Sequence, residues 1–184
     1  VIVEFHAFDI PVEKIPGAEE LKDAFMRSKD YWGGQKTSQT RDFFETALKE
    51  YDKGTISVLR ISDFNTKGLR GSREIRDTDW TNLIKSSGVS DKHGTAGGSY
   101  GIGKYATFAC SKFSTVFYST YDINNEQAYQ GVSRIVTFTR ADGEDTTGLG
   151  FYGEERNKPV YEQLNLDPNF SRKLEQYGTD IYVM

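Results

Sequence analysis

A glycine-rich segment, Gly94-Thr-Ala-Gly-Gly-Ser-Tyr-Gly-Ile-Gly-Lys104, holds the residues best suited to bind an anion. Glycines let backbone N–H groups approach a phosphate closely, and the N-terminus of a following helix adds a favourable dipole. A lysine at the loop-to-helix junction can donate to phosphate as a point charge. By itself this segment suits either a phosphate loop or a plain flexible surface loop.

Three nucleotide-binding motifs compete for the same residues. From Gly98 to Lys104 the segment matches G-x-x-x-x-G-K, but Tyr105 stands where a P-loop needs a Ser or Thr for magnesium. From Gly101 to Ala106 it matches G-x-G-x-x-A, but no predicted strand leads directly into it, as a dinucleotide-binding turn requires. The third motif is a glycine-rich nucleotide lid that leads into a helix.

Two predicted strand ends carry polar residues that could recognise a base. Asp63 ends one strand, and turn residues with Gly68 follow it. A carboxylate there can accept the exocyclic amine of adenine, while the glycine lets the ring lie against the backbone. Thr179 follows Gly178 into the last strand, where its hydroxyl could reach the same base directly or through water. Each residue also has an ordinary interpretation, as a turn-capping Asp and a β-favouring Thr.

Taken in order, these segments resemble the motifs of the GHKL superfamily of Bergerat-fold ATPases, and within it the chaperone and MutL-like branch. Ser62-Asp-Phe-Asn-Thr-Lys-Gly-Leu69 resembles the D-x-G-x-G adenine motif. Gly98-Ser-Tyr-Gly-Ile-Gly-Lys-Tyr-Ala-Thr-Phe-Ala109 is similar to the G-x-x-G-x-G lid and its helix. Thr115–Thr120 resembles the next strand, and Gly178-Thr179 matches the terminal G-T step. The resemblance covers residues 55–184.

The resemblance implies a domain that binds ATP with Mg²⁺ and uses binding and hydrolysis as a conformational switch. The partners would be ATP or ADP and downstream domains of the same polypeptide. It further implies that Asp63, Gly68 and Thr179 bind adenine. The residues implied to bind phosphate are Gly97, Gly98, Gly101, Gly103 and Lys104.

The sequence also departs from this family. Asn65 stands where the adenine motif has its first glycine, and Gly68 comes one residue late. Residues 9–54 form a long helical insertion between two strands, and they are a possible surface for a protein partner. The family's E-x-x-x-N helix, whose Glu activates water and whose Asn binds magnesium, is missing, because no Glu here has an Asn four residues later. Glu19 with Asp23 is the nearest imitation, but it follows the first strand.

The catalytic residues and metal ligands therefore stay unassigned, and we expect the E-x-x-x-N helix upstream of Val1. The alternative function is a non-hydrolysing nucleotide sensor or protein-interaction module. A phosphotransferase of the histidine-kinase type is disfavoured, because no helix with a phosphoacceptor histidine is evident. An E-x-x-x-N helix encoded before Val1 would favour the ATPase over the sensor.

Hydrophobic patterning predicts the elements that must position these segments. Their order favours an α+β fold, a two-layer α/β sandwich with a mixed, mainly antiparallel sheet and helices over one face. Asp77 is expected to cap a short helix, and Ala109 and Cys110 to face the core. The predicted strands are 1–8, 55–62, 113–121, 131–140 and 179–184, and the predicted helices are 18–32, 43–51, a short one after 77, one after 103 and one at 170–177.

Length and composition limit the remaining options. A chain of 184 residues predicts one domain, and both ends read as strands, so we expect a piece excised from a longer protein. The net charge of −4 gives no reason to expect direct nucleic-acid binding. One cysteine and two histidines make a disulfide framework or a structural zinc site improbable. No apolar run reaches the roughly 20 residues of a membrane span, which favours a cytoplasmic domain.

Overall fold

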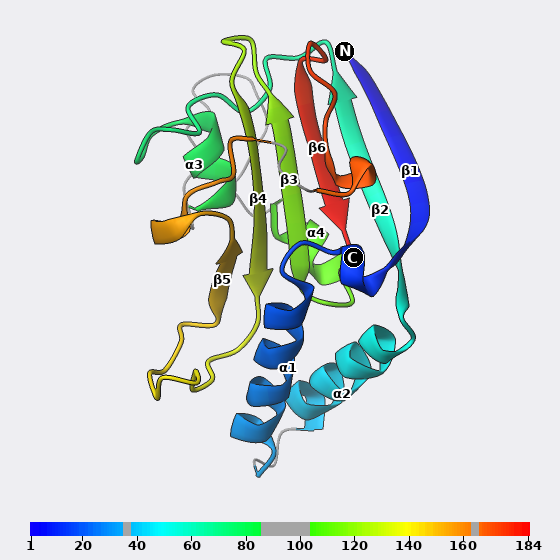
Figure 1. Ribbon diagram of the computed structural model, residues 1–184, viewed down its shortest axis with the longest axis vertical. Helices are drawn as coiled ribbons and strands as arrows, with labels where there is room; N and C mark the ends of the chain where they lie inside the picture. The colour runs from blue at the N-terminus through cyan, green and yellow to red at the C-terminus, as the bar shows by residue number, and fades with distance from the viewer. Residues whose placement is uncertain (35–37, 86–103, 163–165) are drawn as a thin grey trace.

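The fold is built on one six-stranded sheet with the order β1-β2-β6-β3-β4-β5 (Figure 1). All neighbouring strands pair antiparallel, which confirms the α+β class with a mainly antiparallel sheet. The computed structural model describes residues 1–34, 38–85, 104–162 and 166–184. The strands are β1 (Ile2–Pro11), β2 (Thr55–Phe64), β3 (Thr115–Tyr121), β4 (Gln127–Arg134), β5 (Leu149–Tyr152) and β6 (Gly178–Val183).

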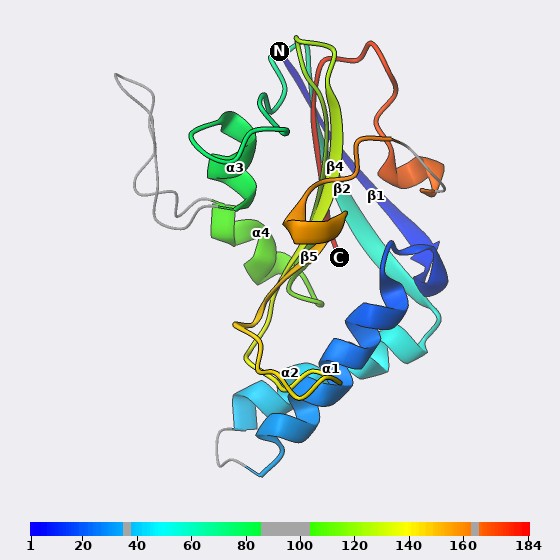
Figure 2. The same cartoon turned by 60° about the vertical axis from the view of Figure 1, so that its left-hand side comes forward.

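Two short helices, α3 (Asp79–Ile84) and α4 (Tyr105–Cys110), lie on one face of the sheet, as the nearly edge-on view in Figure 2 shows. Apolar side chains on this face form one core with the sheet strands. Burial of this surface fixes the two helices on the sheet, since apolar contact is the dominant favourable term. The buried members of this core are Trp80, Ile84, Phe108, Val116, Tyr118, Ala128 and Val132.

A helical hairpin of α1 (Ala18–Trp32) and α2 (Ser38–Asp52) lies between β1 and β2 in the chain. It sits at the end of the sheet where β1 finishes and β2 begins (Figure 1). Leu21, Phe25 and Ser28 recur at helical spacing and are buried, so α1 presents one face to the protein. The buried residues of α1 belong to a second core, which also includes Phe117 of β3 and Tyr182 of β6. The side chains of Phe117 and Tyr182 point to the face of the sheet opposite α3.

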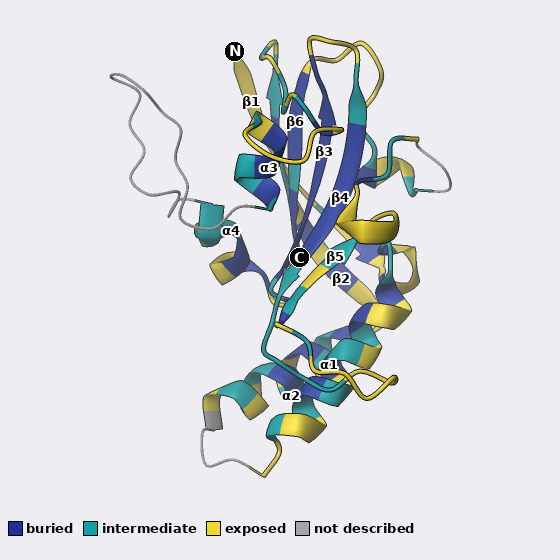
Figure 3. Ribbon diagram, turned by 90° about the vertical axis from the view of Figure 1, so that its left-hand side faces the viewer, coloured by how far each residue is buried: buried dark blue, intermediate teal, exposed yellow. Residues whose placement is uncertain are grey.

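The interior of the sheet is far more buried than its β1 edge. Every residue of β3 is buried, whereas Val3 and Phe5 of β1 are 53% and 69% exposed. Figure 3 shows the same contrast between the inner strands and β1. No helix in the described ranges has the length and apolar character needed to cross a bilayer.

Three predicted elements differ most from the structure. The helix predicted at 170–177 is only a 3-10 turn, Pro168–Phe170, after which the chain is irregular and Leu174 is exposed. The strand predicted at 131–140 starts earlier, because Gln127–Arg134 pairs with β3. A short strand, β5, lies in the stretch expected to be a polar loop, because Leu149–Tyr152 pairs with β4 and its Phe and Tyr residues favour a strand.

The short helices also differ from expectation in detail. Thr78, not Asp77, caps α3, and Asp77 instead has a positive φ of 62°. Ala109 and Cys110 are exposed rather than buried. The reason is that α4 has only six residues and reaches its core through Phe108 alone.

Replacing Thr78 with alanine should lower the free energy of unfolding by about 1–2 kcal/mol. The Thr78 hydroxyl accepts from the Thr81 N–H and donates to the Gly71 carbonyl at 3.0 Å, so its loss breaks the capping box and a loop contact. Urea denaturation measures the change. Thr139→Ala, which removes an exposed bond to Asp145, is the control and should change stability little. Equal losses in the two variants would contradict the capping role.

Candidate functional site

Asp63 and Thr179, both predicted to bind adenine, lie side by side although they are 116 residues apart in sequence. Asp63 is at the end of β2 and Thr179 at the start of β6, one residue beyond the pair formed by Ser62 and Asp180. The Thr179 N–H donates to Asp63 Oδ1 at 2.7 Å. Side chains alternate along β6, and Ile181 packs with the α3 core, so the Thr179 side chain belongs to that same face.

Thr66 joins the predicted Gly68 to this pair. Its hydroxyl donates to Asp63 Oδ1 at 2.9 Å and accepts from the Gly68 N–H at 3.3 Å. Gly68 has a φ of 65°, and a Cβ there would come within 2.9 Å of the Thr120 hydroxyl. Glycine is therefore needed for the loop to lie against the end of β3, in addition to any contact with a ligand.

Thr120 of β3 ties the two sides of the site together. Its hydroxyl accepts from the Leu69 N–H at 2.8 Å and donates to the Gly178 carbonyl at 2.9 Å. Neither Thr120 nor Thr66 was predicted as a site residue from the sequence, because a threonine in a strand or turn is ordinary there. Only their positions in the sequence could have indicated them. Thr66 lies within the aspartate motif, and Thr120 lies near the end of the strand predicted at 113–121.

The two oxygens of the Asp63 carboxylate have different surroundings. Oδ1 accepts from both Thr179 and Thr66. Within the described residues no donor bonds to Oδ2, and the Asp63 side chain is only half-buried. One oxygen thus orients the carboxylate, and the other can accept a hydrogen bond from a ligand.

The predicted phosphate site is described only at Lys104. Gly97, Gly98, Gly101 and Gly103 lie outside the described residues. Lys104 immediately precedes α4, and its Nζ donates to the Asn82 carbonyl at 3.0 Å. Partial burial lowers the pKa of the Lys104 ammonium below its usual value, and the positive charge of Arg134 acts in the same direction.

Glu19 and Asp23 are placed far from the aspartate site. Val3 faces Asp63 near the start of β1, and the strand then runs on to Pro11, roughly 26 Å away at about 3.3 Å per residue. Helix α1 follows that far end, and Asp23 there pairs with Arg27. Among the described residues no cluster of His, Cys, Asp or Glu could hold a metal ion, so no ligand for Mg²⁺ is assigned.

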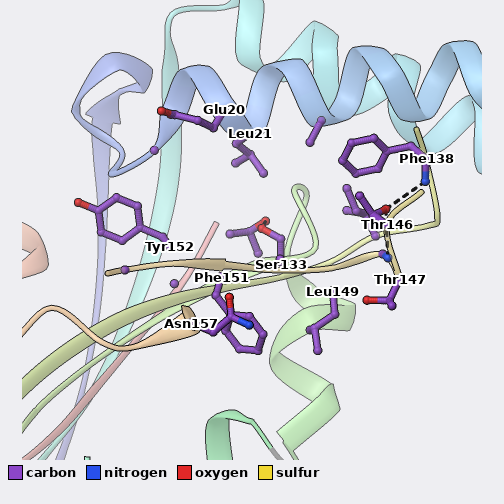
Figure 4. A pocket seen from close by; sticks show the side chains of 18 of the residues that line it. Glu20, Leu21, Ser133, Phe138, Thr146, Thr147, Leu149, Phe151, Tyr152 and Asn157 are labelled. Carbon is purple, nitrogen blue, oxygen red and sulfur yellow. Dashed lines mark hydrogen bonds between the residues drawn. The ribbon is translucent and has the colours of Figure 1, made fainter. Parts of the chain in front are cut away.

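Two cavities lie on the face of the sheet opposite the Asp63 and Thr179 side chains. One of about 670 Å³ is bounded by α1 and strands β3 to β5 (Figure 4), and one of about 620 Å³ lies beside the end of β2. The larger cavity has the size of a small-molecule site. None of the described residues that line it has a buried polar side-chain atom left without a partner. Neither cavity is lined by Asp63, Gly68, Thr179 or Lys104.

The sequence was also compared with known proteins. Neither a model of a known family nor a curated protein matches it.

Proposed function

We propose that this chain is the ATP-binding domain of a GHKL-type ATPase, in which ATP binding and hydrolysis drive a conformational switch. The observation that carries the proposal is the Asp63 carboxylate, with one oxygen bonded by Thr179 and Thr66 and the other left to a ligand. The two segments that resemble the family's adenine and terminal motifs supply Asp63, Gly68 and Thr179, and these residues meet at one end of the sheet.

Adenine suits the free oxygen of Asp63. The exocyclic amine of adenine is a donor, whereas guanine presents a carbonyl at the same position and would face the carboxylate as a second acceptor. A bond to a charged acceptor contributes about 1.5–3 kcal/mol. The site on this basis selects adenine nucleotides over guanine nucleotides.

Lys104 supports binding of the phosphates on the same face. Its charged form is disfavoured by partial burial and by Arg134, so an arriving phosphate would stabilise it. The Lys104 Nζ donates to the Asn82 carbonyl of α3, and a phosphate would compete with that acceptor.

Hydrolysis needs a base near the attacking water and a metal to neutralise developing charge. Neither is assigned within the described residues, and Glu19 is too remote to serve. This observation keeps a second candidate open, a nucleotide sensor that binds ATP without hydrolysing it. Phosphate release by a longer polypeptide that carries an E-x-x-x-N helix distinguishes the ATPase from the sensor.

ATP should bind at least about tenfold more tightly than GTP, because the free oxygen of Asp63 gains a bond from adenine and repels the guanine carbonyl. Titration calorimetry of both nucleotides on the same preparation measures the ratio. Equal affinities would remove Asp63 as an adenine-selecting residue and with it the proposed function.

A further inference from the structure

A buried arginine, Arg172, holds the adenine-site strands from the opposite face of the sheet. Its side chain is 1% exposed, and it lies in the irregular segment that precedes β6. Nη1 donates to Asp180 Oδ1 at 2.7 Å, and Nη2 donates to the Asp63 carbonyl at 2.5 Å. The guanidinium carbon also lies 4.7 Å from the centre of the Phe64 ring. Arg172 thus contacts the backbone of Asp63. It also contacts Phe64, which follows Asp63, and Asp180, which follows Thr179.

The position of these contacts matters because the pairing between β2 and β6 stops there, although β1 and β3 continue to pair with these two strands. The last paired residues of β2 and β6 are Ser62 and Asp180. Immediately beyond them the Thr179 N–H turns to the Asp63 side chain, and the Asp63 carbonyl accepts from Arg172. The placement of the Asp63 carboxylate therefore depends on a side-chain anchor as well as on the sheet.

The anchor is itself tightly held. Arg172 Nε donates to the Gln176 carbonyl at 2.5 Å, and Nη2 also reaches the Tyr177 carbonyl at 3.3 Å. The Asp180 partner is 6% exposed and accepts a further bond from the Tyr182 hydroxyl. A buried Arg–Asp pair with every bond in place fixes one geometry, since the planar guanidinium presents its donors in a rigid fork.

Arg172 does not lie on the α3 face of the sheet, where the proposed nucleotide site is. Asp180 and Tyr182 alternate with Thr179 and Ile181 along β6, and Tyr182 belongs to the core on the α1 side. Any effect of Arg172 on a bound base must therefore pass through Asp63 and Thr179.

We propose that Arg172 is a positioning residue for adenine selection, which aims the free oxygen of Asp63 by anchoring the Asp63 carbonyl and Asp180 together. This inference rests on the proposed function. It adds a determinant of base selectivity from a segment that has no part in the nucleotide motifs.

Arg172→Lys is the sharpest test. Lysine keeps the charge beside Asp180, but as a point donor it cannot also hold the Asp63 carbonyl with the geometry of the fork. ATP affinity should fall about tenfold and GTP affinity less than about twofold, so the preference for ATP narrows. Arg27→Lys, in an exposed pair on α1, is the matched control and should leave both affinities unchanged.

A second readout does not depend on nucleotide. The Thr179 amide proton bonds to Asp63 Oδ1, so its NMR shift should move upfield in Arg172→Lys as that bond lengthens, with the far-UV circular dichroism unchanged. A general loss of structure would instead weaken ATP and GTP binding alike and shift many amides.

A double variant covers the case in which Arg172→Lys does not fold. Arg172→Gln with Asp180→Asn removes both buried charges together and leaves no unpaired ion. A folded variant that keeps the full ATP preference and an unmoved Thr179 amide overturns the proposal, and so does failure of both variants to fold. If the unchanged protein shows no ATP preference, the proposed function fails separately, and the Thr179 amide alone then decides whether Arg172 positions Asp63.

Discussion

Asp63→Asn should weaken ATP binding by about 1–3 kcal/mol, or roughly 5- to 150-fold, while the protein stays folded. Asparagine keeps an oxygen that can accept from the Thr179 N–H at 2.7 Å and from the Thr66 hydroxyl at 2.9 Å. It replaces the free oxygen with an amide N–H₂ that faces the adenine amine donor to donor. The variant therefore separates base recognition from the structural bonds of the same side chain.

The same substitution should improve GTP binding relative to ATP, because the new amide can donate to the guanine carbonyl. Titration calorimetry with both nucleotides gives the two affinities. Asp9→Asn is a matched control, since Asp9 also accepts a hydroxyl bond on a strand, from Ser57, but lies at the other end of β1. A folded Asp63→Asn variant with unchanged ATP affinity would place the base elsewhere.

Gly178→Ala should lower the free energy of unfolding by about 3–5 kcal/mol, the largest effect on stability expected at this site. Gly178 has a φ of 146°, in a region almost restricted to glycine. A Cβ there would lie 2.5 Å from Asp63 Oδ1 and would also meet the Asp63 carbonyl and Arg172 Nη2. The added methyl group must push β6 away from β2 or displace the Arg172 side chain from the Asp63 carbonyl.

Gly143→Ala is the matched control for this change. Gly143 has a φ of 88° but nothing within 4 Å of the added Cβ, so it tests backbone strain alone and should cost about 1–2 kcal/mol. Urea denaturation of both variants gives the difference. If Gly178→Ala were no more destabilising than Gly143→Ala, the close approach of β6 to Asp63 would be looser than the structure shows.

Local patterns were sufficient to predict much of the fold. The spacing of Leu21, Phe25 and Ser28 predicted α1, and the β-branched run at 55–62 predicted β2. These predictions are possible because the residues that an element buries recur with the period of a helix or of a strand. The same reasoning failed at 170–177, where Phe170 suggested a helix. There the Arg172 side chain bonds to the Gln176 and Tyr177 carbonyls and also to the Asp63 carbonyl, 109 residues away in sequence. The spacing of apolar residues does not indicate such a contact.

The candidate site shows the same division. The sequence by itself determined that Asp63 would end a strand, that Gly68 would follow in a turn and that Thr179 would begin the last strand. Only the tertiary structure decided that β6 lies between β2 and β3, which brings Thr179 to Asp63 and Thr120 to Gly178. The physical reason is that periodicity specifies which face of a strand is buried but not which strand lies beside it, since pairing depends on groups far apart in the chain.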